Sequence, residues 1–565
     1  MNKQLFLKKI TTKKYLKRLT ILAIIIFAIY CLYNLGFFYT VQNPRWDKGW
    51  ENIKSIFSFS SHQKDLSYNI WYLNFKYFLI TLQSVTLGTF FGFFLAIITG
   101  YFSATNIHKH KIFSIILKVI LMLLRAFPVI VFILLFKNAF SAQLASFTLY
   151  FWFTWLWMNR YISDLIESSD TKVYYRDIYL GKNKIASFYK NIYLQVRIKF
   201  FLNFFIAYES NIRWVAILGL VGINGLGIFF SNPRIYKDSF GITLLFIALF
   251  ILLIEIILFS LNKVLLVQKE IKPANKKDIY SFKYNWKKYV LILMLMCYFA
   301  ILIWGFISLS NSEIYWTTLN KYFSSIFKFD FSDFNISLLA QYWIIIQQAF
   351  LSIVIGYIFA VFYSYVLSEK INKTYNVLAF KSLLTLIKVI PTFFWFLIFN
   401  PIMDQTTAIT IALIVSAFRK LTKQVTESIN TIPLHIIIMY KSKGWNKLKI
   451  YRWYILPYVN KQLISVFIFQ SEDSIRSAIN YGAFANIGIY NTVLKYQENG
   501  DYNKIFPIIL PAYILFILIE ITFWLSKEKN IFKFERQPKI YQLAKISHKY
   551  SKFYKKLKTS NKRIK

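Results

Sequence analysis

Cysteine is nearly absent from this chain of 565 residues, whose two cysteines are Cys31 and Cys297. They do not have the short spacing of a metal site or of a disulfide framework, so we expect small residues packed within helices. Histidine is almost as rare, with five scattered residues, and no Cys/His or Ser/His/Asp arrangement can be assembled from the sequence. We therefore expect neither a metal site nor enzymatic catalysis.

A phosphate-binding loop is also missing, because Gly-x-x-x-x-Gly-Lys-Ser/Thr does not occur. Acidic residues are few, 25 against 68 Lys and Arg, and the formal net charge of +43 would ordinarily suggest nucleic acid. The basic residues lie mainly between and beyond long apolar runs, however, as in membrane proteins whose positive loops face the cytoplasm. We expect membrane lipids as partners, no nucleic acid, and no cofactor or ATP bound by this chain.

Apolar residues dominate instead. The chain is 57% hydrophobic and 16% charged, with a mean hydropathy of +0.45. Several apolar runs reach the roughly 18 residues of a membrane span. We predict an all-α polytopic membrane protein with about 12 transmembrane helices, six in each half. The expected spans lie near 20–38, 73–102, 113–137, 142–165, 201–222 and 241–262, then near 289–309, 341–367, 377–399, 406–426, 461–485 and 505–526.

The charge distribution predicts the orientation of these helices. The N-terminal segment 1–19, the linker 263–288 and the tail 527–565 are basic, whereas the segments expected outside carry roughly balanced charges. Both termini and the linker are therefore expected in the cytoplasm, and the protein in the cell membrane. Each half then has an even number of spans, which makes the first half (20–262) and the second half (289–526) parallel.

The two halves also resemble each other in sequence. The clearest matches pair Arg125–Phe132 with Lys388–Trp395, and Glu209–Arg213 with Glu472–Arg476. A repeat of this length is a duplicated domain rather than a solenoid unit of roughly 20–50 residues. In so apolar a chain it predicts a transporter built from two related halves around a central path.

Proline interrupts the third span of each half, at Pro128 and Pro391. Because proline lacks an N–H and clashes with the preceding turn, we expect a kink at both positions. Arg125 and Lys388 lie three residues earlier, and we expect them to stabilise the kinked span rather than to touch a substrate.

The longest loops expected in the cytoplasm, about 166–200 and 427–460, follow the fourth span of each half. The second predicts a helix, a break at Gly444 and a basic helix ending at Pro457. It resembles the coupling loop of permeases of ATP-binding-cassette (ABC) importers, in which a glycine precedes Ile-x-Leu-Pro at fixed spacing. Gly444, Leu456 and Pro457 match that pattern, whereas the family's Glu-Ala-Ala is absent.

The first loop matches the same pattern less completely. Ile192 and Leu194 agree with it, Gln195 replaces the proline, and Lys182, beside Gly181, replaces the glycine. For either loop alone, an ordinary amphipathic surface loop is the alternative. Their identical placement in the two halves favours coupling to a partner.

A charged motif followed by glycines marks the fifth span of each half. It resembles the fifth-span signature of phosphonate-type ABC permeases, aromatic-Glu-x-Asn-x-Arg and then a glycine-rich stretch. Within that family the chain looks most like the fused permeases of the high-affinity transport system of wall-less bacteria, the mycoplasmas. The matching residues are Glu209, Asn211, Arg213, Gly219, Gly222, Gly225 and Gly227, and in the shorter second copy Glu472, Arg476, Gly482 and Gly488.

The resemblance implies a fold, a function and partners. It implies two parallel six-helix permease domains of the ABC type I importer, driven by a separate ATPase in two copies that binds the ATP. It also implies an extracellular substrate-binding lipoprotein and a phosphonate or related phosphorylated, anionic cargo. A secondary transporter of the six-plus-six major-facilitator type is the alternative, although that class lacks paired coupling loops.

The role of the charged motif stays open at this point. Glu209 and Arg213 are four residues apart, as are Glu472 and Arg476, so each pair can close on one helix face. The pairs either neutralise each other and fix helix packing, or present arginines to an anionic substrate on the central path. The glycines after Arg213 serve either close helix packing or a break in the helix.

Overall fold

The chain is built of helices. The computed structural model describes residues 3–42, 44–60, 69–108, 111–220, 222–231, 233–236, 239–260, 282–326, 328–430 and 432–534. Most of the expected linker 263–288 and of the tail 527–565 lies outside these ranges. The chain divides into two compact units, Met1–Ile517 and Leu518–Lys565, and the contacts described below all belong to the first.

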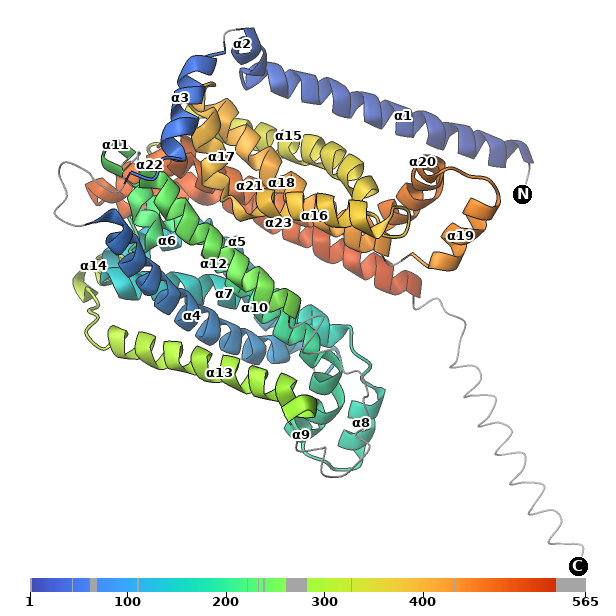
Figure 1. Cartoon of the computed structure of the whole chain (residues 1–565), viewed down its shortest axis with the longest axis horizontal. Helices are drawn as coiled ribbons and strands as arrows, with labels where there is room; N and C mark the ends of the chain where they lie inside the picture. Colours follow the sequence, from blue (N-terminus) through green and yellow to red (C-terminus); the bar gives the residue numbers. More distant parts are fainter. Residues whose placement is uncertain are drawn as a thin grey trace, which may run out of the picture. The chain divides into compact units, whose positions relative to one another are not determined.

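The helices of the first half follow the expected order of spans (Figure 1). They are α1 (Lys3–Asn34), α2 (Phe37–Gln42), α3 (Trp46–Ile56), α4 (Ile70–Ser103), α5 (Lys111–Ala126), α6 (Val129–Ala139), α7 (Ala142–Glu167), α8 (Lys172–Tyr179), α9 (Lys184–Phe188), the π-helix η1 (Tyr189–Tyr193), α10 (Leu194–Leu220), the 3₁₀ turn η2 (Leu226–Phe230), α11 (Pro233–Tyr236) and α12 (Phe240–Ser260).

The second half repeats much of this order. Its helices are α13 (Phe282–Leu309), α14 (Trp316–Ile326), α15 (Ile336–Leu367), α16 (Thr374–Val389), α17 (Thr392–Phe399), α18 (Gln405–Asn430), α19 (Leu434–Ser442), α20 (Lys447–Ile450), the π-helix η6 (Tyr451–Ile455), α21 (Leu456–Tyr481), the 3₁₀ turn η7 (Gly482–Phe484), α22 (Gly488–Asn499) and α23 (Tyr502–Phe534).

Five of these helices are long and apolar enough to cross a membrane on their own: α4, α12, α13, α15 and α23. Two bent pairs, α5 with α6 and α16 with α17, raise the number to seven. Each of the other expected spans coincides with a helix, but α7, α10, α18 and α21 carry charged side chains and α1 has a shorter apolar stretch. A polytopic membrane protein is therefore supported, whereas the number of twelve spans stays a prediction.

Both third spans break at their prolines. Each bent pair turns by 78°, at the Phe127–Pro128 and Ile390–Pro391 positions. Proline ends the first helix, since the residue before it is pushed out of the helical region and its own nitrogen cannot donate. The kink expected from the sequence is thus present in each half, and it leaves the last carbonyl groups of α5 and α16 in need of donors.

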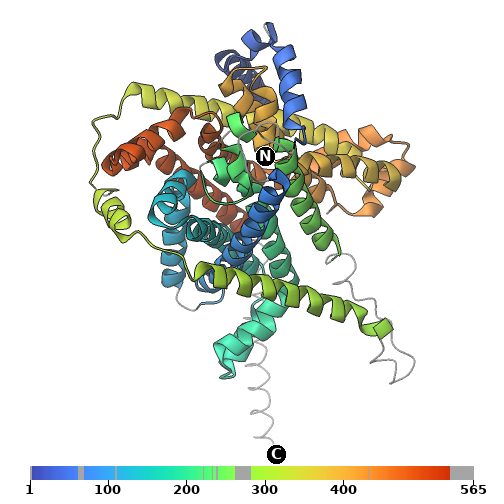
Figure 2. The same cartoon turned by 60° about the vertical axis from the view of Figure 1, so that its left-hand side comes forward.

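The first helices are exchanged between the halves, which the sequence did not predict. α1 packs on α15 of the second half, where the Asn34 amide donates to Gln347 at 2.8 Å. α13 packs in turn on α4 of the first half, with Gly305 against Leu87. Figures 1 and 2 show α13 alongside α4 in both views. Each half therefore carries a helix that belongs in sequence to the other.

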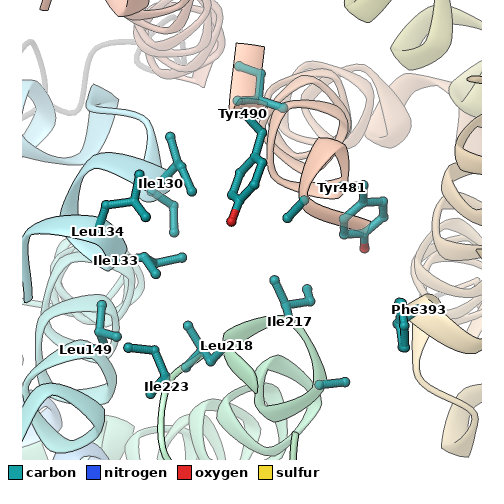
Figure 3. Packing of buried hydrophobic residues seen from close by; sticks show 14 of the residues in the cluster. Ile130, Ile133, Leu134, Leu149, Ile217, Leu218, Ile223, Phe393, Tyr481 and Tyr490 are labelled. Atoms are coloured by element: carbon teal, nitrogen blue, oxygen red, sulfur yellow. The ribbon is translucent and has the colours of Figure 1, made fainter. Parts of the chain in front are cut away.

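The halves also share one apolar core. α6 contributes Ile130, Ile133 and Leu134, and these residues belong to the same buried cluster as Phe393 of α17 and Tyr490 of α22. Figure 3 shows these side chains on elements of both halves around a common region, together with Ile217, Leu218 and Tyr481. Apolar side chains of both halves thus meet in one buried cluster.

Candidate functional site

The two candidate coupling loops have the same local structure. In each, a short helix ends at a glycine in the left-handed region, Gly181 with φ of +80° and Gly444 with φ of +77°. An asparagine two residues later, Asn183 or Asn446, caps the next helix through its side-chain oxygen. A π-helix then leads into the fifth long helix, at η1 and at η6. The loops are therefore structural repeats as well as sequence repeats.

The structure corrects the sequence alignment of the first loop. Lys182 does not take the place of the glycine in the coupling-loop pattern, because Gly181 itself makes the left-handed turn that Gly444 makes in the second loop. A β-carbon at either glycine would meet no other atom, so the backbone angle alone requires glycine there. The first loop is one residue longer between this turn and the fifth helix, which shifted the alignment.

Lys182 instead helps to hold the first loop together. Its ammonium donates to Asp177 Oδ1 at 2.9 Å, and the Asn191 amide donates to Asp177 Oδ2 at 2.9 Å. These two donors lower the pKa of the Asp177 carboxyl below its usual value, with the Asn191 hydrogen bond as the larger cause. Asp177 was not predicted from the sequence, because its contacts with Lys182 and Asn191 depend on the geometry of the turn.

The second loop is held by aromatic contacts at the equivalent place. The ring of Tyr440 lies 4.7 Å from that of Trp445 and 4.9 Å from that of Tyr454, centroid to centroid. The Lys449 ammonium sits over the Trp445 ring at 5.0 Å. One loop thus uses an ion pair and the other a ring cluster to fix the same turn.

The remaining coupling residues take different positions. Ile192 is fully buried in the core beneath the first loop, whereas Leu194 is partly exposed. Leu456 begins α21 and packs on the corresponding core of the second loop, and the exposed Pro457 follows it in the first turn of that helix. Ile192 and Leu456 therefore anchor the two loops, whereas Leu194 and Pro457 lie at the surface.

Both charged pairs of the fifth span form as the spacing predicts. Arg213 Nη2 lies 2.5 Å from Glu209 Oε1, and Arg476 Nη2 lies 2.8 Å from Glu472 Oε1. A further acid or base joins each pair, with Glu255 at 3.9 Å from Arg213 and Arg160 at 3.5 Å from Glu472. In both halves the pair lies within a larger network of charges.

Each of these arginines also crosses to the broken helix of the other half. Arg213 of the first half donates to the carbonyl of Lys388, at the end of α16. Arg476 of the second half donates to the carbonyls of Arg125 at 2.8 Å and Phe127 at 3.3 Å, at the end of α5. Helix ends leave carbonyl groups without partners and attract positive charge. We call these two crossed contacts the arginine straps.

The second strap is the more deeply buried. The side chain of Arg476 is 4% exposed, against 26% for Arg213. The Arg476 guanidinium also lies 4.4 Å from the centroid of the Phe516 ring and 5.5 Å from that of Trp157. The strap arginines therefore direct their hydrogen bonds to protein groups of both halves, which favours the packing interpretation over direct substrate contact.

The other motif residues serve close packing within one half. The Asn211 amide donates to the hydroxyls of Thr89 and Thr154 at 2.8 Å each, which ties α10 to α4 and α7. Gly219 and Gly227 lie backbone against backbone, so a side chain on either would collide with the other. Gly225 approaches Thr81, whose hydroxyl accepts the Leu226 N–H at 2.9 Å, and Gly222 lies near Lys137.

The second copy of the motif borders open space instead. Gly482 and Gly488 line a cavity of about 560 Å³ between α15, α18 and η7, at the end of α18 opposite the coupling loop. In the first half, Ser146 of α7 donates to Asn224 O in the longer connection between α10 and η2. In the second half α21 runs directly into η7. The motif residues are therefore not gathered at one common site.

Arg419 is the main residue that the sequence reading missed. It lies on α18 and donates to the carbonyls of Ile387, Lys388 and Ile390 and to the Thr392 hydroxyl. An arginine in an apolar run without an acid three or four residues away was the available signal. The fifth-span pattern does not include this position, because Arg419 lies on the fourth long helix of its half.

The fold and the loops together indicate the membrane subunit of a transporter, and comparison with known proteins narrows the class. The chain is 26% identical over 467 residues to a Mycoplasma genitalium protein named ABC transport system permease protein p69, covering 80% of this chain and 86% of that one. It is 25% identical over 460 residues to the Mycoplasma pneumoniae protein of the same name, covering 79% and 84%.

These two likenesses support an ABC permease, as the coupling-loop and fifth-span motifs implied. They do not extend to phosphonate specificity. No family model matches the chain, and no solved structure matches it.

Proposed function

We propose that this chain is the membrane-spanning permease subunit of an ABC importer, with both permease domains fused in one polypeptide. The observation that carries the proposal is the pair of matching loops, each with a left-handed glycine, a capped second helix and a π-helix. A partner with twofold symmetry needs two equivalent docking points, and this chain has them at equivalent places. The ABC permease relatives support the same conclusion.

The proposed partner at these loops is a pair of ABC ATPase subunits. Large side chains around the turns are exposed, with Tyr179 at 88% and Leu180 at 68% in the first loop and Trp453 at 66% in the second. Such exposure of apolar side chains marks a contact surface. We place both loops and both termini in the cytoplasm, where ATP binding and hydrolysis by the partner would move the two halves.

The proposed cargo is a phosphonate or a related phosphorylated, anionic small molecule, delivered by a substrate-binding lipoprotein. The resemblance of the fifth-span motif to phosphonate-type permeases supports this cargo class. The motif arginines contribute indirectly in this proposal, by strapping the halves together across the helix breaks rather than by holding the cargo.

Reconstitution tests the function directly. The chain is purified with its co-purifying ATPase, placed in proteoliposomes with the binding lipoprotein, and supplied with that lipoprotein's bound ligand. We expect uptake that requires ATP, stops with vanadate and continues when a protonophore collapses the ion gradients. Uptake driven by an ion gradient without ATP would instead establish the secondary transporter.

A further inference from the structure

Arg419 lies beside a small cavity at the broken third span of the second half. Arg419 is 7% exposed and lines a cavity of about 30 Å³ together with Arg213, Thr392 and Pro391. About 10–15 Å³ of such space is enough to hold one water molecule, so this cavity admits a small ion. Two arginines from different halves therefore line the same cavity.

The positive charge at this place is not balanced by acidic side chains. No carboxylate in the described part of the chain forms an ion pair with Arg419, whereas Arg213 is paired with Glu209. Both arginines donate to the same Lys388 carbonyl, so their guanidinium groups are close together. Isolated charge in a poorly solvated interior is costly, and so is like charge at short range.

The surroundings add more positive charge than negative. The side chains of Lys388 and Lys423 act electrostatically on the two nearby carboxylates, Glu209 and Glu255. Four cationic side chains thus share two acids. The carbonyl end of α16 supplies about half a negative charge, which compensates one arginine in part and leaves the other without a counter-charge.

The first break differs at the position of Arg419. Gly92 packs against Trp155, and the matching Gly356 packs against Phe418, so the next residues, Leu156 and Arg419, occupy equivalent positions. Leu156 is buried and apolar. At the first break Arg476 meets the helix end, and Arg125 and Arg160 also act on its partner Glu472. Positive charge therefore exceeds negative charge near both breaks, and the additional arginine on the fourth long helix is particular to the break between α16 and α17.

We propose that the cavity between Arg213, Arg419 and Thr392 binds a small anion, either a free halide or oxyanion or the anionic group of a transported molecule. The guanidinium groups supply fixed donors that suit an oxyanion, and the Thr392 hydroxyl adds a third polar group. This site is a property of the chain itself and does not depend on the proposed ATP-driven transport.

Anion-dependent stability of the purified full-length chain in detergent tests the site. Thermal unfolding is followed at constant ionic strength while sodium gluconate, too bulky for the cavity, is replaced by chloride, phosphate or methylphosphonate. We expect a saturable rise of a few degrees in Tm, because a ligand that binds only the folded state stabilises it. No rise with any of the three anions would overturn the proposal.

Variants at Thr392 separate this site from general salt effects. Thr392→Asp has nearly the same size and places a carboxylate beside Arg419, so it should remove the anion-dependent rise. Thr392→Val, which removes the hydroxyl but adds no charge, should weaken the rise without abolishing it, whereas Arg197→Leu, at an exposed arginine elsewhere, should leave it unchanged. Arg419→Leu should abolish it. An equal rise in Thr392→Asp and in the unaltered chain would contradict the assignment.

The choice of anion also distinguishes the two sources of the bound group, a free ion and a transported molecule. A rise with chloride assigns a free resident ion, whereas a rise with phosphate and methylphosphonate but not chloride assigns the anionic group of a cargo. Either result supports the site. Loss of ATP-driven uptake in the reconstituted complex would leave this result unchanged, so failure of the transport function and failure of the anion site can be told apart.

Discussion

At the scale of single residues, the charged side chains make two kinds of contact. Ion pairs within one helix follow from local spacing, whereas hydrogen bonds to the other half depend on the fold. The pairs Glu209 with Arg213 and Glu472 with Arg476 followed from helical spacing, and both form. Their carbonyl partners in the opposite half could not be predicted, because those contacts join positions far apart in sequence. Arg419 was missed for the same reason.

Substitutions at Arg213 and Glu209 test the first arginine strap. Arg213→Gln should lower the yield of folded chain and its Tm, since losing one member of a partly buried pair costs about 3 kcal/mol or more and the Lys388 carbonyl also loses a donor. Glu209→Gln should cost less, because Arg213 keeps that carbonyl.

The double variant Glu209→Gln/Arg213→Gln distinguishes the strap from simple neutralisation. We expect only partial recovery relative to Arg213→Gln, measured as Tm and as the monodisperse fraction in size-exclusion chromatography. Full recovery of both would show that the arginine serves its glutamate alone and that the crossed contact contributes nothing.

The glycine turn offers a second test at this scale. Gly444→Val forces a β-branched residue into the left-handed region, at a cost of about 1–3 kcal/mol, although there is space around the position. We expect it to reduce the ATP hydrolysis that the chain stimulates in its partner ATPase, while insertion is retained. Gly444→Asn, which tolerates this backbone angle, is the control. Unchanged stimulation in the valine variant would remove this loop as the contact.

At the scale of elements, the sequence predicted the helix breaks at the two prolines but not the exchange of the first helices between the halves. Proline chemistry is local, so the 78° bends at Pro128 and Pro391 were predictable. The packing of α1 on α15 and of α13 on α4 depends on which apolar surfaces meet, and composition does not encode that choice. The sequence match paired Lys182, not Gly181, with Gly444, because only the backbone geometry of the turn shows which position is equivalent.

A cysteine pair tests the helix exchange. With Cys31 and Cys297 replaced by alanine, Asn34→Cys/Gln347→Cys should cross-link under mild oxidation, since the native side chains are hydrogen-bonded at 2.8 Å. After cleavage at a protease site inserted in the linker 263–288, the two halves should then migrate together on a non-reducing gel. Asn34→Cys/Asn74→Cys, whose two cysteines lie in the same fragment, controls for association of the halves without a covalent link. Fragments of the Asn34→Cys/Gln347→Cys chain that still separate after oxidation would contradict the exchange.

At the scale of the whole molecule, the two halves have the same local structure at the coupling loops but differ elsewhere. The straps and exchanged helices are reciprocal, whereas the 560 Å³ cavity, Arg419 and the short fifth-span connection occur in the second half. The sequence indicated the duplication and the loops from periodic and motif signals. It did not indicate that side chains of both halves would share one apolar core, because that depends on how the halves meet.

Photo-cross-linking tests most directly whether the two glycine-turn loops contact an ABC ATPase, as we propose. A photo-activatable amino acid is placed at Leu180 and, separately, at Lys443, each next to a glycine turn, and the products of irradiation in native membranes are identified by mass spectrometry. We expect both positions to cross-link to a subunit carrying a nucleotide-binding phosphate loop, in comparable yield. Normal insertion with no such cross-link from either position would contradict it.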